Sequence, residues 1–290
     1  MSPSLSSEQP LLSLRLSVDY PNKPGVLTDT ALEIQRGEVV GLIGESGSGK
    51  STIALAILHL LHLKGGRAQG QVIFAGENLL EKNERELRTI RGRRISVVLQ
   101  SPLTALNPAV KIGAQVREAW RAHANGDKNT CERAVCDALR GVGLPADESF
   151  LKRRSSQLSV GQAQRVVIAM AILHRPELLI ADEATSALDT ITQSEILNLF
   201  SQLNRELGMA ILYISHDLLS VAALCDRIAI LNAGKIIECG PPEAIFNSPR
   251  HEYTRRLIAA LPARPQQSSS HRVRGENADQ PVPVSSAFSE

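Results

Sequence analysis

The chain has little net charge, few cysteines and few aromatic side chains, and it contains no long apolar run. Its 32 Lys and Arg oppose 30 Asp and Glu, which gives a net charge of +2 over 290 residues. Proteins that wrap nucleic acid carry a strong basic excess, so we expect no nucleic-acid partner. No apolar run approaches the roughly 18 residues that cross a bilayer, and residues 53–63 are interrupted by His59 and His62. We therefore expect no membrane-spanning segment in this chain.

The cysteines also exclude two common kinds of site. No Cys-x-x-Cys pair is present among the four cysteines, which are Cys131, Cys136, Cys225 and Cys239. Their spacing therefore supports neither a zinc ribbon nor a redox dithiol. Residues 1–10, MSPSLSSEQP, lack the basic start and apolar centre of a secretory signal. Reduced thiols and the missing signal both predict a cytoplasmic protein.

The composition predicts one folded domain between two tails. Residues 1–10 and 263–290 are polar and rich in Ser and Pro. Such segments cannot bury enough apolar surface to become ordered. We expect a flexible N-terminal tail over 1–10, a domain over 11–262 and a disordered tail over 263–290.

Short apolar runs separated by helical patterns predict an α/β fold with a mainly parallel sheet. Strands are expected at 11–20, on both sides of a turn at Arg36-Gly37, and at 71–74, 95–99, 178–181, 210–214 and 227–231. A helix is expected over 50–63, and a hairpin should turn at Ala233-Gly234. Residues 102–175 show helical periodicity and almost no strand pattern, so we expect an inserted α-helical subdomain there.

A phosphate-binding loop is the most specific motif. Residues 44–51, GESGSGKS, fit G-x-x-x-x-G-K-[ST] between a buried strand and a helix. In this motif glycines expose backbone N–H groups to the β-phosphate, and the lysine, Lys50, reaches the β and γ oxygens. The hydroxyl of Ser51 can bind Mg²⁺. A surface turn with a solvated lysine is a weak alternative, because strand, loop and helix all agree.

Two further motifs are compatible with nucleotide hydrolysis. The apolar run 178–181 leads into Asp182 and Glu183; the first is suited to hold Mg²⁺ and the second to act as general base on water. Residues 158–162, LSVGQ, precede an amphipathic helix with Ser159 as its expected N-cap. The positive end of that helix could bind an anion, although a plain structural cap is an equal alternative on this motif alone.

Together, and in this order, the motifs resemble the nucleotide-binding subunit of an ATP-binding cassette (ABC) transporter over about residues 11–262. The resemblance implies a P-loop NTPase fold: a RecA-like core with a mainly parallel sheet, an N-terminal antiparallel β portion and an inserted α-helical subdomain. It implies ATP and Mg²⁺ as cofactors. LSVGQ corresponds to the family signature LSGGQ, residues 186–189 to the D-loop, and His216 in YISHD to the switch histidine.

The resemblance also implies roles for individual residues. It implies catalytic roles for Glu183, His216 and Gln100, and metal binding by Ser51, Gln100 and Asp182. It implies nucleotide contacts for Tyr20, Gly44, Glu45, Ser46, Gly47, Ser48, Gly49, Lys50, Ser51, Thr52, Ser159, Gly161, Gln162 and Asp189. Tyr20 is expected to stack on adenine, with a strand-edge aromatic as the alternative.

Two positions depart from the family pattern. Val160 replaces the first signature glycine. Residues 178–183 correspond to the Walker B motif of the family, and Ala184 replaces the proline that usually follows its glutamate, Glu183. A β-branched residue at 160 would be strained if the backbone there required a positive φ. Since the catalytic residues are all present, we expect the site formed by the phosphate-binding loop 44–51 (Walker A) and the Walker B motif of this chain to be competent for hydrolysis.

Two flanking segments narrow the resemblance to importer ATPases for oligopeptides, dipeptides and nickel. They are the residues after Gln100, QSPLTALNPAVKIG, and the C-terminal segment at about 240–262. The expected partners are two integral membrane permease subunits, an extracytoplasmic solute-binding protein indirectly, and a second ATPase chain, either a homologue in a heterodimer or another copy. The expected location is the cytoplasmic face of the inner membrane, as a peripheral protein.

The cargo and the direction of transport stay open at this point. Peptide is the first expectation, and nickel or another metal complex is the next. The alternatives are an ABC exporter subunit, a soluble ABC ATPase outside transport and a cassette that only binds nucleotide. Neither long coiled-coil insertions nor tandem cassettes are present, which disfavours repair and ribosomal ATPases, and the presence of Glu183 and His216 disfavours the binding-only reading.

Overall fold

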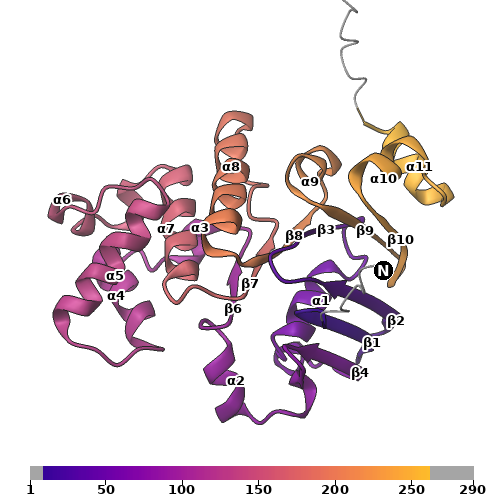
Figure 1. Cartoon of the computed structure of the whole chain (residues 1–290), viewed down its shortest axis with the longest axis horizontal. Helices are drawn as coiled ribbons and strands as arrows, with labels where there is room; N and C mark the ends of the chain where they lie inside the picture. Colours follow the sequence, from indigo (N-terminus) through magenta and orange to yellow (C-terminus); the bar gives the residue numbers. More distant parts are fainter. Residues whose placement is uncertain (1–8, 262–290) are drawn as a thin grey trace, which may run out of the picture. The chain divides into compact units, whose positions relative to one another are not determined.

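The computed structural model describes residues 9–261, so the predicted tails 1–10 and 263–290 lie almost wholly outside the described residues. All the elements below belong to one compact unit, which ends at Ala259. Two sheets organise it (Figure 1). The first is antiparallel in the order β2-β1-β4-β5, with β1 Leu12–Tyr20, β2 Lys23–Ile34, β4 Arg67–Phe74 and β5 Glu77–Asn78.

The second sheet has the order β10-β9-β3-β8-β7-β6. Its strands are β3 Val39–Ile43, β6 Ile95–Val98, β7 Leu178–Asp182, β8 Ala210–Ser215, β9 Arg227–Asn232 and β10 Lys235–Gly240. All neighbours are parallel except β10, which forms an antiparallel hairpin with β9. The hairpin turns at Ala233 and Gly234, both at positive φ, as expected from the sequence.

Helices follow most strands of the second sheet. They are α1 Lys50–Ile57, α2 Glu84–Ile90, α3 Pro102–Ala105, α4 Ile112–Arg121, α5 Lys128–Gly141, α6 Glu148–Leu151, α7 Val160–Ile172, α8 Thr190–Leu207, α9 Leu218–Leu224, α10 Pro242–Asn247 and α11 Glu252–Ala259, with short 3-10 turns η1 Leu61–Lys64, η2 Leu79–Glu81 and η3 Ser155–Gln157. Between β6 and β7 the chain forms only helices and turns, α3 to α7, which lie together on one side in Figure 1. The mixed fold class predicted from the sequence is confirmed.

A hydrophobic core lies between the two sheets. It joins alternating residues of β1, such as Leu12, Leu14 and Leu16, to α1 and to the strands of the parallel sheet. The alternation of buried and less buried residues in β1 is the period of a strand with one face in a core. In contrast, β3 is buried along its whole length, as expected for a central parallel strand. The phosphate loop therefore starts from one of the most rigidly held strands.

One local prediction was wrong. The helix expected over 50–63 ends at Ile57, because His59 adopts a left-handed φ of 51° and the chain enters a 3-10 turn at Leu61. Leu58 and Leu61, on either side of this break, both pack in the core. The predicted turn at Arg36-Gly37 is present, and the strands that it joins, β2 and β3, belong to different sheets. No helix in residues 9–261 is long and apolar enough to span a bilayer.

Candidate active site

The site residues come together because parallel strands end at one edge of the sheet. In register, Ile43 of β3 is opposite Ser215 of β8, and Asp182 of β7 is opposite Ile214. The segments that follow these strand ends therefore meet: the loop at 44–51, Gln100 after β6, Glu183 after β7 and His216 after β8. Ligands of open α/β sheets bind at this carboxyl edge.

The loop 44–51 adopts a conformation that requires glycine. Gly47 and Gly49 have φ of 80° and 111°, and Gly49 is the N-cap of α1. A Cβ on Gly44 would collide with the carbonyl of Leu231 in β9, and one on Gly49 would lie 2.6 Å from Leu27. The loop is thus closed by neighbours on both sides, with the N-terminus of α1 at its end, where anions are favoured.

Lys50 is held inside this loop. Its Nζ donates to the carbonyls of Gly44 at 2.7 Å and Glu45 at 3.0 Å, and the residue is only 8% exposed. Burial lowers the pKa of the Lys50 ammonium, although the charges of Glu183 and Asp182 act in the opposite direction. An ammonium that two neutral carbonyls satisfy only partly is prepared to bind an anion such as a phosphate.

Asp182 lies beneath the pocket, at the end of β7. Its Oδ1 is buried without a hydrogen-bond partner among the described residues. Burial raises the pKa of the Asp182 carboxyl, while the nearby Ser51 hydroxyl and Lys50 ammonium lower it. A buried, unpaired carboxylate oxygen beside a hydroxyl offers the oxygen ligands that Mg²⁺ prefers, directly or through water. The residues therefore fit the expected ion.

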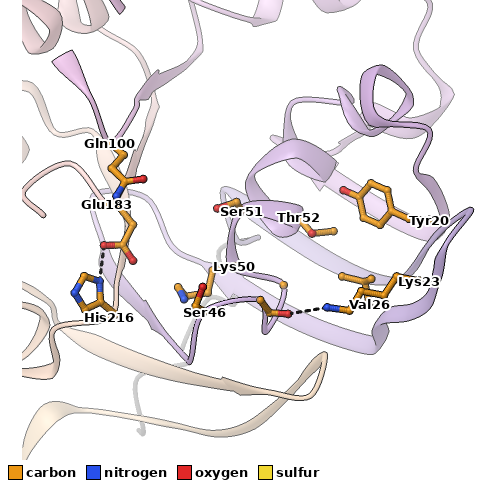
Figure 2. Close-up of a pocket in the computed structure, with 12 residues that line it drawn as sticks. Tyr20, Lys23, Val26, Ser46, Lys50, Ser51, Thr52, Gln100, Glu183 and His216 are labelled. Atoms are coloured by element: carbon orange, nitrogen blue, oxygen red, sulfur yellow. Dashed lines mark hydrogen bonds and ion pairs between the residues drawn. The ribbon is translucent and has the colours of Figure 1, made fainter. Parts of the chain in front are cut away.

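Glu183 and His216 form a pair on the rim of the pocket. His216 Nδ1 lies 2.8 Å from Glu183 Oε2 (Figure 2). Glu183 has a left-handed φ of 52°, and its N–H donates to the carbonyl of Ile214 at 2.9 Å. For a residue other than glycine this backbone is strained by about 1–3 kcal/mol, and such strain is concentrated at functional sites. Figure 2 shows Gln100 next to this pair, on the same side of Lys50.

The opposite side of the pocket carries Tyr20 (Figure 2). A Cβ on Gly66 would lie 2.8 Å from the Tyr20 ring, so the ring is backed by the chain at this glycine. The cavity between Tyr20 and His216 has a volume of about 650 Å³, within the range of small-molecule sites. Ten residues expected from the sequence line it: Tyr20, Ser46, Gly47, Gly49, Lys50, Ser51, Thr52, Gln100, Glu183 and His216.

The signature and D-loop residues do not line this cavity. Ser159 caps α7 and forms a capping box with Gln162, accepting its N–H at 3.1 Å. Asp189 caps α8 by accepting the N–H groups of Ile191 and Thr192. Within one chain these residues therefore act as helix caps, and Gly161 packs next to Thr192 of α8.

Sequence reasoning missed two lining residues, Lys23 and Val26. Lys23 Nζ is 3.5 Å from the carbonyl of Gly47. Both residues lie in the first part of β2, further from the Arg36-Gly37 turn than the apolar pattern of the sequence indicates. The Pro21-Asn22 pair directly after Tyr20 is a turn signal that would have predicted the earlier start.

Known proteins show the same organisation. The family described as ABC transporter matches residues 27–186. The dipeptide transport ATP-binding protein DppD of Escherichia coli K12 is 43% identical over 229 residues, 79% of this chain and 70% of that protein. The oligopeptide transport ATP-binding protein OppD of Bacillus subtilis is 40% identical over 244 residues, 84% of this chain and 68% of that protein.

Solved structures agree with the fold. The cbiO1 protein of Clostridium perfringens, part of an ABC transporter complex, has a TM-score of 0.73 at 27% identity, over 88% of this chain and 96% of that one. The ATP-binding cassette MJ0796, in a dimeric post-hydrolysis state bound to ADP and Pi, has a TM-score of 0.68 at 27% identity, over 80% and 98%. This chain belongs to the ABC transporter family, as an ATP-binding subunit that hydrolyses ATP.

Proposed function

We propose that this chain is the ATPase subunit of an ABC importer that couples ATP hydrolysis to peptide uptake through separate membrane subunits. The single observation that supports hydrolysis best is the Glu183–His216 pair, 2.8 Å apart beside the phosphate loop. Support for peptide cargo comes from the relatives, which are named for dipeptide and oligopeptide transport. The cargo itself would be selected by subunits other than this chain.

We propose the following residue roles, which the lining of the pocket supports. Tyr20 stacks on adenine, and the loop 44–52 surrounds the phosphates, with Lys50 exchanging its two carbonyl partners for phosphate oxygens. Ser51, Gln100 and Asp182 would hold Mg²⁺, which neutralises phosphate charge when bound. Glu183 accepts a proton from the attacking water, and His216 orients the Glu183 carboxylate and faces the γ-phosphate.

We further propose that the site is completed by a second ATPase chain. The signature residues Ser159, Gly161 and Gln162, together with Asp189, lie outside the cavity of their own chain, so they are free to face the nucleotide of a partner. Exposed apolar side chains lie near the signature, the D-loop and His216: Val160 is 39% exposed, Ile191 76% and Leu219 39%. Apolar side chains left open beside three site segments favour a surface that another chain covers. A heterodimer is the first expectation, and a homodimer is the second.

The complex would place this chain at the cytoplasmic face of the membrane as a peripheral subunit. ATP closes the two cassettes because it contacts both of them only in the closed state, which shifts the population toward closure. The helical region α3–α7 would transmit this movement to the membrane subunits.

The test is to capture the tagged full chain from detergent-solubilised native membranes and to identify its partners by mass spectrometry. Two multi-span proteins and a second cassette ATPase support the importer, and an associated solute-binding protein then leads to the cargo. Ribosomal or DNA-repair partners in the soluble fraction would leave the ATPase intact and would overturn the transport function. A matched capture with the Lys50→Ala chain controls for contacts that do not depend on nucleotide.

A further inference from the structure

The C-terminal helix α11 reaches the phosphate loop from a distant part of the chain. The backbone N–H of Glu45, the second residue of the loop, donates to the hydroxyl of Tyr253 at 3.1 Å. Tyr253 is 4% exposed, so its hydroxyl is a fixed partner rather than a mobile surface group. These residues are 208 positions apart in the sequence. Neither motif reasoning nor the roles proposed above involve Tyr253.

Glu45 is the residue through which this contact can influence the loop. Its carbonyl accepts from Lys50 Nζ at 3.0 Å and from the N–H of Ser48 at 3.2 Å. The N–H and the carbonyl of one residue are therefore both engaged, one toward α11 and the other toward the inside of the loop. A shift of the Tyr253 hydroxyl would move the backbone that positions the Lys50 ammonium.

Hydrogen bonds from β10 hold the chain just before α11. Glu238 of β10 accepts the N–H of Arg250 at 2.8 Å and that of His251 at 3.2 Å, just before α11 begins. Although burial acts to raise it, the pKa of Glu238 is lowered overall by the groups that hydrogen bond to it. The N–H of Tyr253 donates to His251 Nδ1 at 3.1 Å. A continuous series of hydrogen bonds therefore connects β10 to Tyr253.

The other side of the loop start is already restrained. Gly44 lies against the carbonyl of Leu231 in β9 so closely that no Cβ fits between them. Tyr253 supplies the restraint on the next residue, from α11, which follows the β9–β10 hairpin after α10. The hairpin and α11 therefore hold the first two residues of the loop between them. Figure 1 shows α11 beside α10, the helix that follows β10.

We propose that Tyr253 is a positioning residue for ATP: its hydroxyl holds the Glu45 N–H, and so keeps the phosphate loop in the conformation that receives the phosphates. The Tyr253 hydroxyl contacts the loop backbone rather than the nucleotide. Because the loop is already ordered, ATP binding costs less conformational entropy, and the affinity for ATP is higher. This inference rests on the nucleotide-binding role proposed for residues 44–52.

The main test is the Tyr253→Phe variant of the full chain, which keeps the buried ring and removes only the hydroxyl. Loss of one hydrogen bond of ordinary strength should weaken binding of a fluorescent ATP analogue about three- to tenfold. In the assembled ATPase the KM for ATP should rise by a similar factor, while kcat changes by less than about twofold because Glu183 is untouched. The thermal midpoint should fall by no more than about 2–4 °C, the contribution of one ordinary hydrogen bond in a chain of this size.

Thr254→Val is the matched control. Thr254 is fully buried on the same helix, and its hydroxyl lies next to Glu238 rather than the loop, so the substitution alters the seat of α11 without touching the Tyr253–Glu45 hydrogen bond. It should leave the affinity for the analogue unchanged. If Thr254→Val and Tyr253→Phe weaken binding equally, α11 acts only through general stability and the positioning role is wrong.

Glu45→Pro removes the donor instead of the acceptor and provides a second line of evidence. Glu45 lies between β3 and α1, so proline there interrupts no helix or strand. If the hydrogen bond is the route, adding Tyr253→Phe to Glu45→Pro causes no further loss of affinity. Additive losses, or a Tyr253→Phe affinity equal to that of the wild type, overturn the proposal. A wild-type chain that fails to bind the analogue would instead refute the proposed nucleotide site itself.

Discussion

Asp182 and Glu183 are neighbours in sequence but occupy different environments, and this difference separates their roles. Asp182 ends β7 with a buried, unpaired oxygen, whereas Glu183 turns out of the strand at a positive φ and meets His216. Adjacent residues of a strand point to opposite faces, so two carboxylates in sequence cannot share one site without a change in backbone. The left-handed Glu183 is that change.

The first prediction concerns the burial of Asp182. Because its folded-state pKa is raised above the usual 3.8, the ionised carboxylate destabilises the nucleotide-free fold at neutral pH. Asp182→Asn should therefore raise the thermal midpoint without nucleotide by up to about 4 °C and abolish hydrolysis. The gain should shrink as the pH falls through the raised pKa toward 3.8, because wild-type Asp182 then becomes neutral too. Differential scanning calorimetry at several pH values measures this.

The control for this prediction is a carboxylate that already accepts a hydrogen bond in the fold. Asp127 accepts the N–H of Thr130 at 2.8 Å as the N-cap of α5. Asp127→Ala should lower stability at neutral pH, because it removes the acceptor that caps α5. A stability loss in Asp182→Asn of the same sign would show that its carboxylate is not left unpaired in the fold.

The second prediction concerns Glu183. Glu183→Gln should bind ATP with nearly unchanged affinity and lose about 10²–10⁴ in turnover, because the amide cannot accept the water proton. Phosphate release and binding of a fluorescent analogue measure the two properties separately. Glu177→Gln is matched, since Glu177 pairs with Arg36 and Arg94 away from the pocket and should retain turnover. Normal turnover in Glu183→Gln would remove its role as base.

At the scale of elements, the sequence predicted features that depend on local pattern and missed those that depend on distant partners. The fully apolar run of β3 and the N-cap at Ser159 were readable, because burial and capping each have a local pattern. The end of α1 was not, because residues 50–63 contain neither glycine nor proline to mark the left-handed turn at His59.

The site shows the same division. Residues in short motifs, such as Lys50 and Glu183, were predicted individually from the sequence. They meet in the pocket because the parallel strands before them end at the same edge of the sheet. Lys23 enters the pocket only through the pairing of β2 with β1, and Tyr253 only through packing across 208 positions. No local pattern specifies either contact.

The third prediction concerns α7 and its unusual signature residue. Val160 is the first residue of the helix and does not have a positive φ, so the valine creates no backbone strain. Val160→Gly should change the ATPase rate of the assembled protein by no more than about twofold. Gly161 differs, because a Cβ there would lie 2.8 Å from Thr192, whose hydroxyl is fixed to Asp189 at 2.7 Å.

Gly161→Ala should therefore push the start of α7 away from α8 and cost about 1–3 kcal/mol of stability. Its ATPase rate should fall well below that of Val160→Gly, as steady-state phosphate release would show. If Val160→Gly instead accelerates hydrolysis strongly, the valine impairs the nucleotide site that it faces across the dimer. The prediction of a small effect, which rests on the unstrained backbone at Val160, would then be wrong.

At the scale of the whole molecule, the cavity in one chain is lined by the phosphate loop, Glu183 and His216 but by none of the signature residues. A single chain can therefore bind nucleotide along one face only. If the signature of a second chain completes the site, the monomer binds ATP but lacks the contacts that align it for hydrolysis. Alignment contributes several kcal/mol to catalysis, so the difference should be large.

The last prediction follows from this geometry. The rate of hydrolysis per chain should not be constant on dilution: it should rise with concentration in a homodimer, and in a heterodimer it should depend on adding the second cassette chain. Ser159→Arg should reduce the rate without weakening the first binding step, since Ser159 is remote from the cavity of its own chain. Light scattering alongside phosphate release tests this. Constant activity from a monomeric chain, unaffected by Ser159→Arg, would mean that one chain holds a complete site, and α7 would then serve only as a structural helix.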